Sequence, residues 1–207
     1  MKTSKPGFRN AFTLVEMLVV IGIIAILTGA SIGAFSKMTK TAERAKCQEL
    51  VSNTATALTA LYQQTGIWPK VLRANGATDG QLDENAALAL VNYMSLSTDS
   101  NGKLSGIDKF GIVTPWAVAH IKRRGNSASL SDKVAGGTLQ DHILHYAVDL
   151  DGDGIIPGVN VGGETVDIRA TVAVWCCGKD GVLETYSRGL RKDDCYSWTK
   201  GQTQGVR

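Results

Sequence analysis

Three carboxylates alternate with other residues in one short segment of the chain. Asp149, Asp151 and Asp153 stand two positions apart, and a glycine follows the last of them. Carboxylate oxygens clustered on a turn suit Ca²⁺, because this ion takes about six to eight oxygen ligands. The spacing also resembles the start of an EF-hand loop. We therefore predict a structural Ca²⁺ site at Asp149, Asp151 and Asp153.

This acidic segment departs from an EF-hand at its far end. The twelfth position counted from Asp149 is Asn160, where an EF-hand has a bidentate glutamate. Strands rather than helices are expected on both sides, so Glu164 or Asp167 would have to complete the ligand shell. The alternative is an ordinary polar hairpin connection, since Asp-Gly is a common turn pair.

Four cysteines form a second group with potential chemistry. Cys47, Cys176, Cys177 and Cys195 contain no Cys-x-x-Cys spacing, which argues against a zinc or redox motif. In an oxidising compartment Cys195 is expected to bridge to Cys176 or Cys177, and only one of these adjacent strand residues can face it. Cys47 is expected to be a small buried apolar side chain. The alternative is a fully reduced set.

The sequence lacks patterns typical of enzymes and of nucleic-acid binding. The three histidines do not form a zinc-protease motif, and no nucleophile elbow, P-loop or dinucleotide-binding motif occurs. Three basic residues lie in the first eleven positions, and the remaining 19 are balanced by 19 acidic residues. A chain that is neutral after its start is a poor general nucleic-acid binder. We therefore expect neither an enzyme nor a nucleic-acid partner. The basic run at 122–124 is interpreted as a solvated strand end, and the alternative is a DNA contact.

The basic start leads directly into a long apolar run. Residues 12–35 contain a single charge, Glu16. As a helix these 24 residues extend ~36 Å, which exceeds the ~30 Å hydrocarbon core of a bilayer. We predict a transmembrane helix, with an uncleaved signal anchor or a signal peptide cut after Ala25 or Ala30 as alternatives. A carboxylate in hydrocarbon costs roughly 2.5–3.5 kcal/mol, so Glu16 needs a partner.

The residues around the boundary between the basic start and the apolar run resemble the N-terminus of type IV prepilins and pseudopilins. The match consists of the basic leader at 1–11, a small residue at Ala11 and the sequence FTLVEML that begins at Phe12. The resemblance implies that a prepilin peptidase cuts between Ala11 and Phe12 and methylates the new amine. Most members have glycine where this chain has Ala11. The Phe12 amine would then pair with Glu16 of a neighbouring subunit, which neutralises both charges.

The C-terminal segment is similar to the end of the major pseudopilins of type II secretion. The similarity lies in the sequences CGKDG at 177–181 and DDCYSW at 193–198. In that family this loop holds a structural Ca²⁺, which implies ligands at Asp180, Asp193 and Asp194. Basic residues between the two segments lower the local negative charge. The alternative is a solvated loop held in place by Trp198.

A long helix is expected to position the N-terminal groups. Its second half carries one apolar stripe, at Cys47, Val51, Thr54, Leu58 and Leu61. This spacing predicts a single helix from about residue 12 to about residue 64. Gly66 and Pro69 are expected to end it.

The part that follows is predicted to be an α+β head, in which a small antiparallel sheet packs on the long helix. A second helix is expected near 84–96, with Asp83 as its N-cap. Strands are expected in three segments rich in Val, Ile, Tyr and Thr, near 117–122, 142–148 and 166–176. The predicted domains are a leader (1–11), a transmembrane helix segment (12–35), an amphipathic continuation of the helix (36–65) and a pseudopilin head (66–207).

These patterns predict a structural subunit of a membrane-rooted helical filament, and the resemblance favours a pseudopilin of a type II secretion system. The implied partners are other pseudopilins, the prepilin peptidase, the inner-membrane secretion platform and, before assembly, membrane lipid. The resemblance implies a single-pass inner-membrane protein with a cytoplasmic leader and a periplasmic head. The alternatives are a type IV pilin for adhesion or DNA uptake, and a membrane-anchored Ca²⁺-binding domain without a filament.

Overall fold

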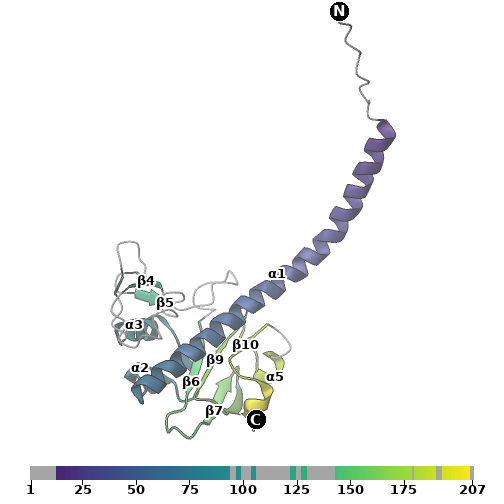
Figure 1. The fold of residues 1–207 in the computed structure, drawn as a ribbon. Helices are drawn as coiled ribbons and strands as arrows, with labels where there is room; N and C mark the ends of the chain where they lie inside the picture. The colour runs from purple at the N-terminus through teal and green to yellow at the C-terminus, as the bar shows by residue number, and fades with distance from the viewer. Residues whose placement is uncertain are drawn as a thin grey trace, which may run out of the picture. The chain divides into compact units, whose positions relative to one another are not determined.

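Figure 1 shows the computed structural model of the chain, which describes residues 13–93, 97–98, 104–105, 122–124, 127–129, 143–178, 180–189 and 193–205. Ala11, Phe12 and all but the last residue of the strand predicted near 117–122 lie outside these residues. The chain divides into two compact units, Met1–Ala42 and Glu43–Arg207. The second unit, called the head unit below, therefore begins within the long helix and not after it.

Helix α1 (Leu14–Thr65) is the longest element of the fold. Its bounds agree with the helix predicted from about residue 12 to about residue 64. Gly66 ends the helix with φ +67°, and its N–H donates to the Tyr62 carbonyl over 2.7 Å. This is the left-handed conformation that a glycine adopts at a helix C-terminus without steric cost.

Within the head unit, α1 buries one face. The apolar stripe recurs every three or four residues, as one face of a helix requires. Its single polar member, Thr54, donates its hydroxyl to the Leu50 carbonyl over 2.7 Å, so no polar group is left unsatisfied there. The stripe residues, each at most 2% exposed, are Cys47, Val51, Thr54, Leu58 and Leu61.

The first hydrophobic core lies between this face of α1 and a four-stranded antiparallel sheet. The sheet order is β1 (Gly80–Gln81), β6 (His145–Val148), β9 (Val172–Cys176) and β10 (Cys195–Tyr196). All of β9 is buried, because successive side chains of a strand point to opposite faces and both faces are covered. Val172, Val174 and Cys176 pack with α1, whereas Ala173 and Trp175 lie in a second core.

The second core lies against a three-stranded antiparallel sheet. Its order is β11 (Thr203–Gln204), β8 (Glu164–Ile168) and β7 (Ile156–Val161). Helix α5 (Tyr186–Gly189) contributes Tyr186 to this core. Aromatic rings fill much of it, with Trp175 and Trp198 meeting edge to face at 5.7 Å between ring centroids.

The strand expected over 166–176 is in fact two strands in different sheets. β8 ends at Ile168 and β9 begins at Val172. Between them the backbone N–H of Arg169 donates to the Gln202 carbonyl over 2.8 Å, and that of Ala170 donates to Ile168 over 3.2 Å. The chain leaves one ladder and turns into the other at this point. The strand expected near 142–148 is present as β6.

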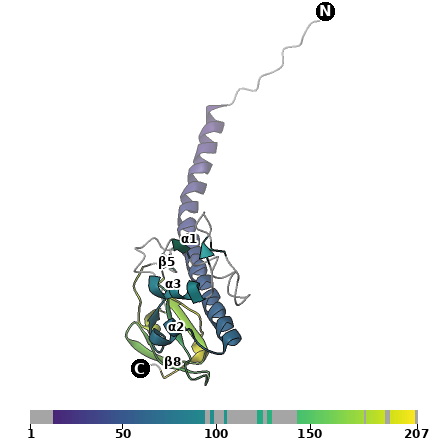
Figure 2. The same cartoon turned by 90° about the vertical axis from the view of Figure 1, so that its left-hand side faces the viewer.

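The remaining described elements are short. Helix α3 (Glu84–Tyr93) begins after Asp83, whose Oδ1 accepts the Ala86 N–H over 2.7 Å, so the predicted N-cap is confirmed. It lies against α2 (Lys70–Asn75), as Figure 2 shows. The other elements are β2 (Ser97–Thr98) paired with β3 (Leu104–Ser105), β4 (Lys122–Arg124) paired with β5 (Ser127–Ser129), and the 3-10 helix η2 (Lys200–Gln202). The described residues thus confirm the α+β class.

Candidate functional site

The first turn of α1 contains a reciprocal hydrogen-bonding pair. Glu16 Oε2 accepts from the Thr13 backbone N–H over 2.9 Å and from the Thr13 hydroxyl over 2.8 Å. In return the Glu16 N–H donates to Thr13 Oγ1 over 3.2 Å. This is a capping box, which satisfies two N–H groups that a helix start leaves without intrahelical partners. Glu16 therefore has a local partner in addition to the intermolecular one that the sequence predicts.

The surface that follows this cap is apolar. All eleven large apolar side chains between Leu14 and Leu27 are 44–81% exposed. Fully burying one such side chain contributes about 1.5–3 kcal/mol of favourable free energy. Covering this surface with lipid or with other apolar helices would therefore be strongly favourable. No helix among the described residues combines the length and the hydropathy needed to cross a bilayer.

The first acidic loop is organised around one buried carboxylate. Asp149 is 3% exposed, and its two carboxylate oxygens accept the N–H groups of Gly152 and Gly154 over 2.7 and 2.8 Å. Asp151 and Asp153 are exposed. The carboxylates of the three aspartates lie within 4.8 Å of one another, a spacing that a single cation can span. The structure therefore brings the predicted ligands Asp149, Asp151 and Asp153 together.

This loop is attached to the end of α1. The Trp68 indole N–H donates to the Asp149 carbonyl over 2.6 Å. Trp68 in turn stacks on Tyr62 of α1 at 4.5 Å between ring centroids. Trp68 therefore connects the acidic loop to the C-terminal turns of the long helix.

Glu164 and Asp167, the residues considered for completing this ligand shell, are engaged elsewhere. Glu164 accepts from the Ser187 N–H over 2.8 Å and from the Ser187 hydroxyl over 2.6 Å. Asp167 accepts from the Gly158 N–H over 2.8 Å. Both carboxylates join strand β8 to a neighbouring segment, and we assign them no part in the acidic loop.

The second acidic loop also contains a buried carboxylate. Asp194 is 2% exposed, and its Oδ2 accepts from the Glu184 N–H over 3.1 Å and from the Tyr196 hydroxyl over 3.2 Å. Its Oδ1 has no hydrogen-bond partner among the described residues. Burial raises the pKa of Asp194 to about 6, and the nearby charges of Asp193 and Asp180 act in the same direction.

The three carboxylates of this second loop do not converge as those of the first do. Among the described residues, the first loop alone brings three acidic groups close enough together to share one ion. Asp193 Oδ2 instead accepts the Asp180 N–H over 3.2 Å, and Asp180 Oδ1 accepts the Val182 N–H over 2.9 Å. Asp180, Asp193 and Asp194 thus lie in one loop but hold its backbone by separate bonds.

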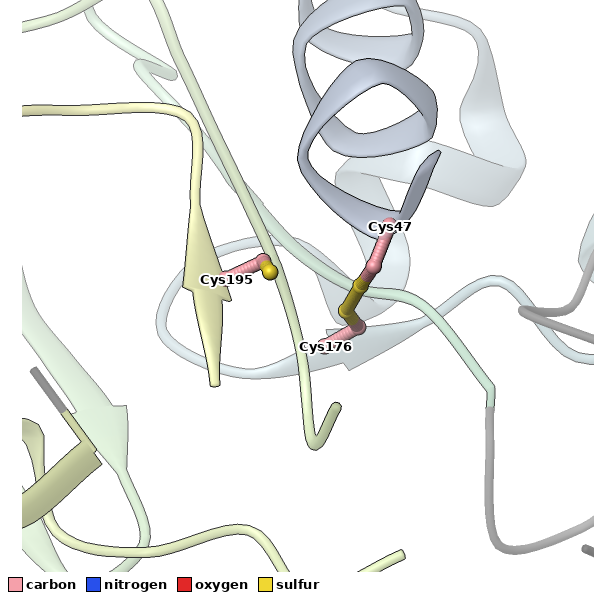
Figure 3. Close-up of side chains that lie close together, drawn as sticks. All are labelled: Cys47, Cys176 and Cys195. Atoms are coloured by element: carbon pink, nitrogen blue, oxygen red, sulfur yellow. A yellow bond between two sulfur atoms is a disulfide. The ribbon is translucent and has the colours of Figure 1, made fainter. Parts of the chain in front are cut away.

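The cysteines pair differently from the expectation. A disulfide joins Cys47 of α1 to Cys176 of β9, and Cys177 and Cys195 take no part in it (Figure 3). The predicted bridge from Cys195 to Cys176 or Cys177 and the assignment of Cys47 as a simple apolar side chain are therefore wrong for this structure. The reason is the packing of α1, whose buried stripe places Cys47 over Cys176 in the first core.

Known proteins resemble this chain in its N-terminal region. Residues 8–32 match the family model described as the prokaryotic N-terminal methylation motif. The type IV major pilin protein PilE of Neisseria gonorrhoeae is 34% identical over 62 residues, which are 30% of this chain and 37% of that pilin. The type IV major pilin protein PilE1 of the same organism is 32% identical over 62 residues, which are 30% of this chain and 29% of that pilin.

These matches cover well under half of each gonococcal pilin. No solved structure matches the chain. A methylation motif at the start of a long helix, followed by an antiparallel α+β head, defines the type IV pilin-like class of proteins. The N-terminal region of this chain is similar to that of type IV pilins, and it contains the prokaryotic N-terminal methylation motif at residues 8–32.

Proposed function

We propose that the chain is a structural, non-catalytic subunit of a membrane-rooted helical filament, and specifically a pseudopilin of a type II secretion system. The exposed apolar surface of α1 between Leu14 and Leu27 carries this proposal. A helix that is apolar on all sides requires lipid or other apolar helices around it. A subunit with such a helix can lie in the bilayer first and in the core of a helix bundle later, because both surroundings are apolar.

Glu16 determines how the helices of neighbouring subunits align when they pack in the filament. Cleavage before Phe12 creates an amine four residues before Glu16 in the sequence. Glu16 of a neighbouring subunit can neutralise this amine. A buried charge is costly without a partner, so only the register that joins the two charges is favourable. Exposure of Glu16 in the single chain leaves it accessible for this contact.

The N-terminus supplies the membrane topology in this proposal. Lys2, Lys5 and Arg9 lie before the apolar run, and the resemblance to prepilins supports a cytoplasmic position for this leader. A prepilin peptidase then removes residues 1–11, and the inner-membrane secretion platform adds the mature subunit to the filament. The head unit lies on the periplasmic side of the inner membrane.

A type IV pilin for adhesion or DNA uptake is the second candidate. The observation in its favour is that the two relatives named above are type IV major pilins. Both candidates use the same N-terminal helix, and they differ in the machinery that assembles the filament. Deletion of the secretion platform or of the pilus platform in the native host therefore separates them.

We also propose that Ca²⁺ stabilises the head unit through one of its acidic loops. Asp149, Asp151 and Asp153 would hold the ion in the first loop, since their carboxylates already lie together. In the second loop the free Oδ1 of Asp194 is the atom that a cation would neutralise. In either place the ion would offset the repulsion between neighbouring carboxylates.

Intact-mass and fractionation measurements test the filament proposal. The chain is produced in a host with an active prepilin peptidase, and the membrane fraction and the sheared surface fraction are analysed. We expect a mature chain that begins at a methylated Phe12 and occurs in both fractions. A chain that retains Met1 and is found only in membranes would instead indicate a simple anchored domain.

A further inference from the structure

Three cysteine sulfurs meet in the first core of the head unit. They come from three elements, since Cys47 belongs to α1, Cys176 to β9 and Cys195 to β10. The exposed fractions of these residues are 2%, 0% and 1%. All three sulfur atoms lie within 4.8 Å of one another. The disulfide between Cys47 and Cys176 therefore has a third sulfur beside it.

The backbone holds Cys195 close to the disulfide. Cys195 lies directly opposite Cys176 in the antiparallel register of β9 and β10. Figure 3 shows its side chain pointing toward the bond between Cys47 and Cys176. Its thiol also contacts the Asp193 carbonyl at 3.5 Å and the Arg44 carbonyl at 3.8 Å, which keeps the sulfur in place.

We propose that Cys47, Cys176 and Cys195 form a thiol–disulfide exchange site in which Cys176 is shared between two partners. The Cys195 thiol gives its proton to water or a buffer base, and the resulting thiolate attacks the Cys176 sulfur. A bond between Cys176 and Cys195 forms, the bond to Cys47 breaks, and the Cys47 thiolate takes up a proton. One disulfide is lost and one is formed, so the exchange needs no oxidant or reductant.

The two pairings connect different parts of the head unit. The bond between Cys47 and Cys176 ties α1 to the sheet, whereas a bond between Cys176 and Cys195 ties two strands of the sheet and releases the helix. In the second state α1 is still held near this point by Gln48, whose Nε2 donates to the Tyr196 carbonyl over 2.8 Å. The exchange therefore controls whether the first turns of α1 in the head unit are covalently attached to the sheet.

Tryptic mapping of the full chain can distinguish the two pairings. Trypsin places the three cysteines in separate peptides, at 47–70, 170–179 and 193–200. Cys177 would share the second peptide, so the Cys177→Ser variant is the working protein, with one disulfide and one thiol per chain. The folded, unreduced chain is moved from pH 5 to pH 8.5, samples are denatured with a maleimide at set times, and the labelled peptide is identified.

Exchange predicts that the label, initially in the 193–200 peptide, appears in the 47–70 peptide and reaches at least a tenth of the total. The matched Cys177→Ser, Cys195→Ala chain has no attacking thiol, and its Cys47 peptide should stay unlabelled. In Cys177→Ser, Cys47→Ser the remaining pair, Cys176 and Cys195, should oxidise in air to a disulfide.

Several results would overturn the proposal. A label that stays in the 193–200 peptide, or a ratio that does not change after the pH jump, would mean that the pairing is fixed. A label in the 170–179 peptide would mean that Cys176 is not the shared residue. Each of these readouts is independent of filament assembly.

Discussion

Thr13 and Glu16 bond to each other in both directions at the start of α1. The Thr13 N–H and hydroxyl donate to Glu16 Oε2 over 2.9 and 2.8 Å, and the Glu16 N–H donates to Thr13 Oγ1 over 3.2 Å. The same carboxylate is proposed to neutralise the Phe12 amine of a neighbouring subunit. Glu16 therefore has a local role, which needs only a hydrogen-bond acceptor, and an intermolecular role, which needs a negative charge.

Substitution by glutamine separates these two roles. Glu16→Gln keeps an acceptor for Thr13, because glutamine also occupies this position in capping boxes, but it removes the charge. We expect Glu16→Gln and Glu16→Leu to insert and be cleaved normally, and both to reduce the filament fraction at least tenfold. The measurement is a quantitative immunoblot of the sheared filament fraction against the total chain.

Thr13→Ala is the matched control for the cap. It removes the hydroxyl and keeps the charge of Glu16, at a cost of about 1 kcal/mol to the helix start. Assembly of this variant should stay within about twofold of the unsubstituted chain. Normal filaments from Glu16→Gln combined with a defect in Thr13→Ala would show that the cap, and not the charge, governs assembly.

If Ca²⁺ binds to one of the acidic loops, it should increase the free energy of unfolding of the head unit. Removing a ligand from that loop should abolish the increase. At an ion concentration of about 100 Kd, binding adds ~2.7 kcal/mol to the free energy of unfolding. Asp151→Ala and Asp180→Ala each remove one exposed carboxylate, one from each loop. We expect little change in chelator for either variant, and loss of the Ca²⁺ increment in the variant whose loop holds the ion.

Asp149→Ala is the structural comparison for this experiment. It removes the acceptor of two backbone N–H groups, so it should destabilise the head unit by about 1–3 kcal/mol even in chelator. Thermal melts in detergent, followed by tryptophan fluorescence with several millimolar Ca²⁺ or with chelator, measure all three variants. Equal midpoints for the unsubstituted chain in both conditions would rule out a stabilising ion in either loop.

The buried carboxylate of Asp194 predicts a pH dependence of unexpected sign for an aspartate. Burial raises its pKa from the ordinary value of 3.8 to about 6 in the folded chain. Between these values the folded state keeps a proton that the unfolded state has lost, so the free energy of unfolding falls as pH increases from about 4 to about 6. The full effect on unfolding is about 2–3 kcal/mol at pH 7.

Asp194→Asn removes this titration. The unsubstituted chain should lose about 2–3 kcal/mol of stability from this group between pH 4 and pH 7, and the variant should not. Relative to the unsubstituted chain, the variant should therefore be about 2–3 kcal/mol more stable at pH 7 than at pH 4. Urea unfolding in chelator at several pH values provides the measurement. A difference that does not vary with pH would mean that Asp194 is solvated and titrates normally.

Gly189 is predicted to be necessary for the packing of the second acidic loop. A Cβ at this position would overlap the Tyr196 hydroxyl and the Asp194 carboxylate, which are part of the buried core. Gly189→Ala should therefore lower the free energy of unfolding by about 1–3 kcal/mol. Gly201→Ala is the matched control, because its Cβ would meet only the Thr199 hydroxyl at 4.0 Å. Equal stability of the two variants would contradict the observed packing of α5.

Local patterns in the sequence predict the parts of this fold that depend on neighbouring residues. The α1 stripe and the Asp83 cap follow from helical spacing and cap chemistry, and the clustering of Asp149, Asp151 and Asp153 follows from their separation of two residues. The Thr13 and Glu16 pair has the same kind of signal, because a threonine three residues before a glutamate is typical of a capping box.

Contacts between distant segments are not predictable in this way. Where 166–176 divides into β8 and β9, the Arg169 N–H donates to the distant Gln202 carbonyl, a contact that no periodicity reveals. The pairing of Cys47 with Cys176 depends on how α1 packs over the sheet, 129 residues away in sequence. Likewise, the free oxygen of Asp194 is a consequence of burial by the loop around α5.

Site-specific photo-cross-linking from Ile21 most directly tests whether α1 builds a filament. A photoreactive phenylalanine analogue at Ile21, in the middle of the exposed apolar surface, is activated in cells that contain the assembly machinery. We predict a ladder of multimers of this chain, which disappears when Glu16→Leu is added and is absent when the analogue replaces exposed Gln81 of the head unit. A probe at Ile21 that yields only monomer, or a ladder unchanged by Glu16→Leu, would contradict the proposed filament role.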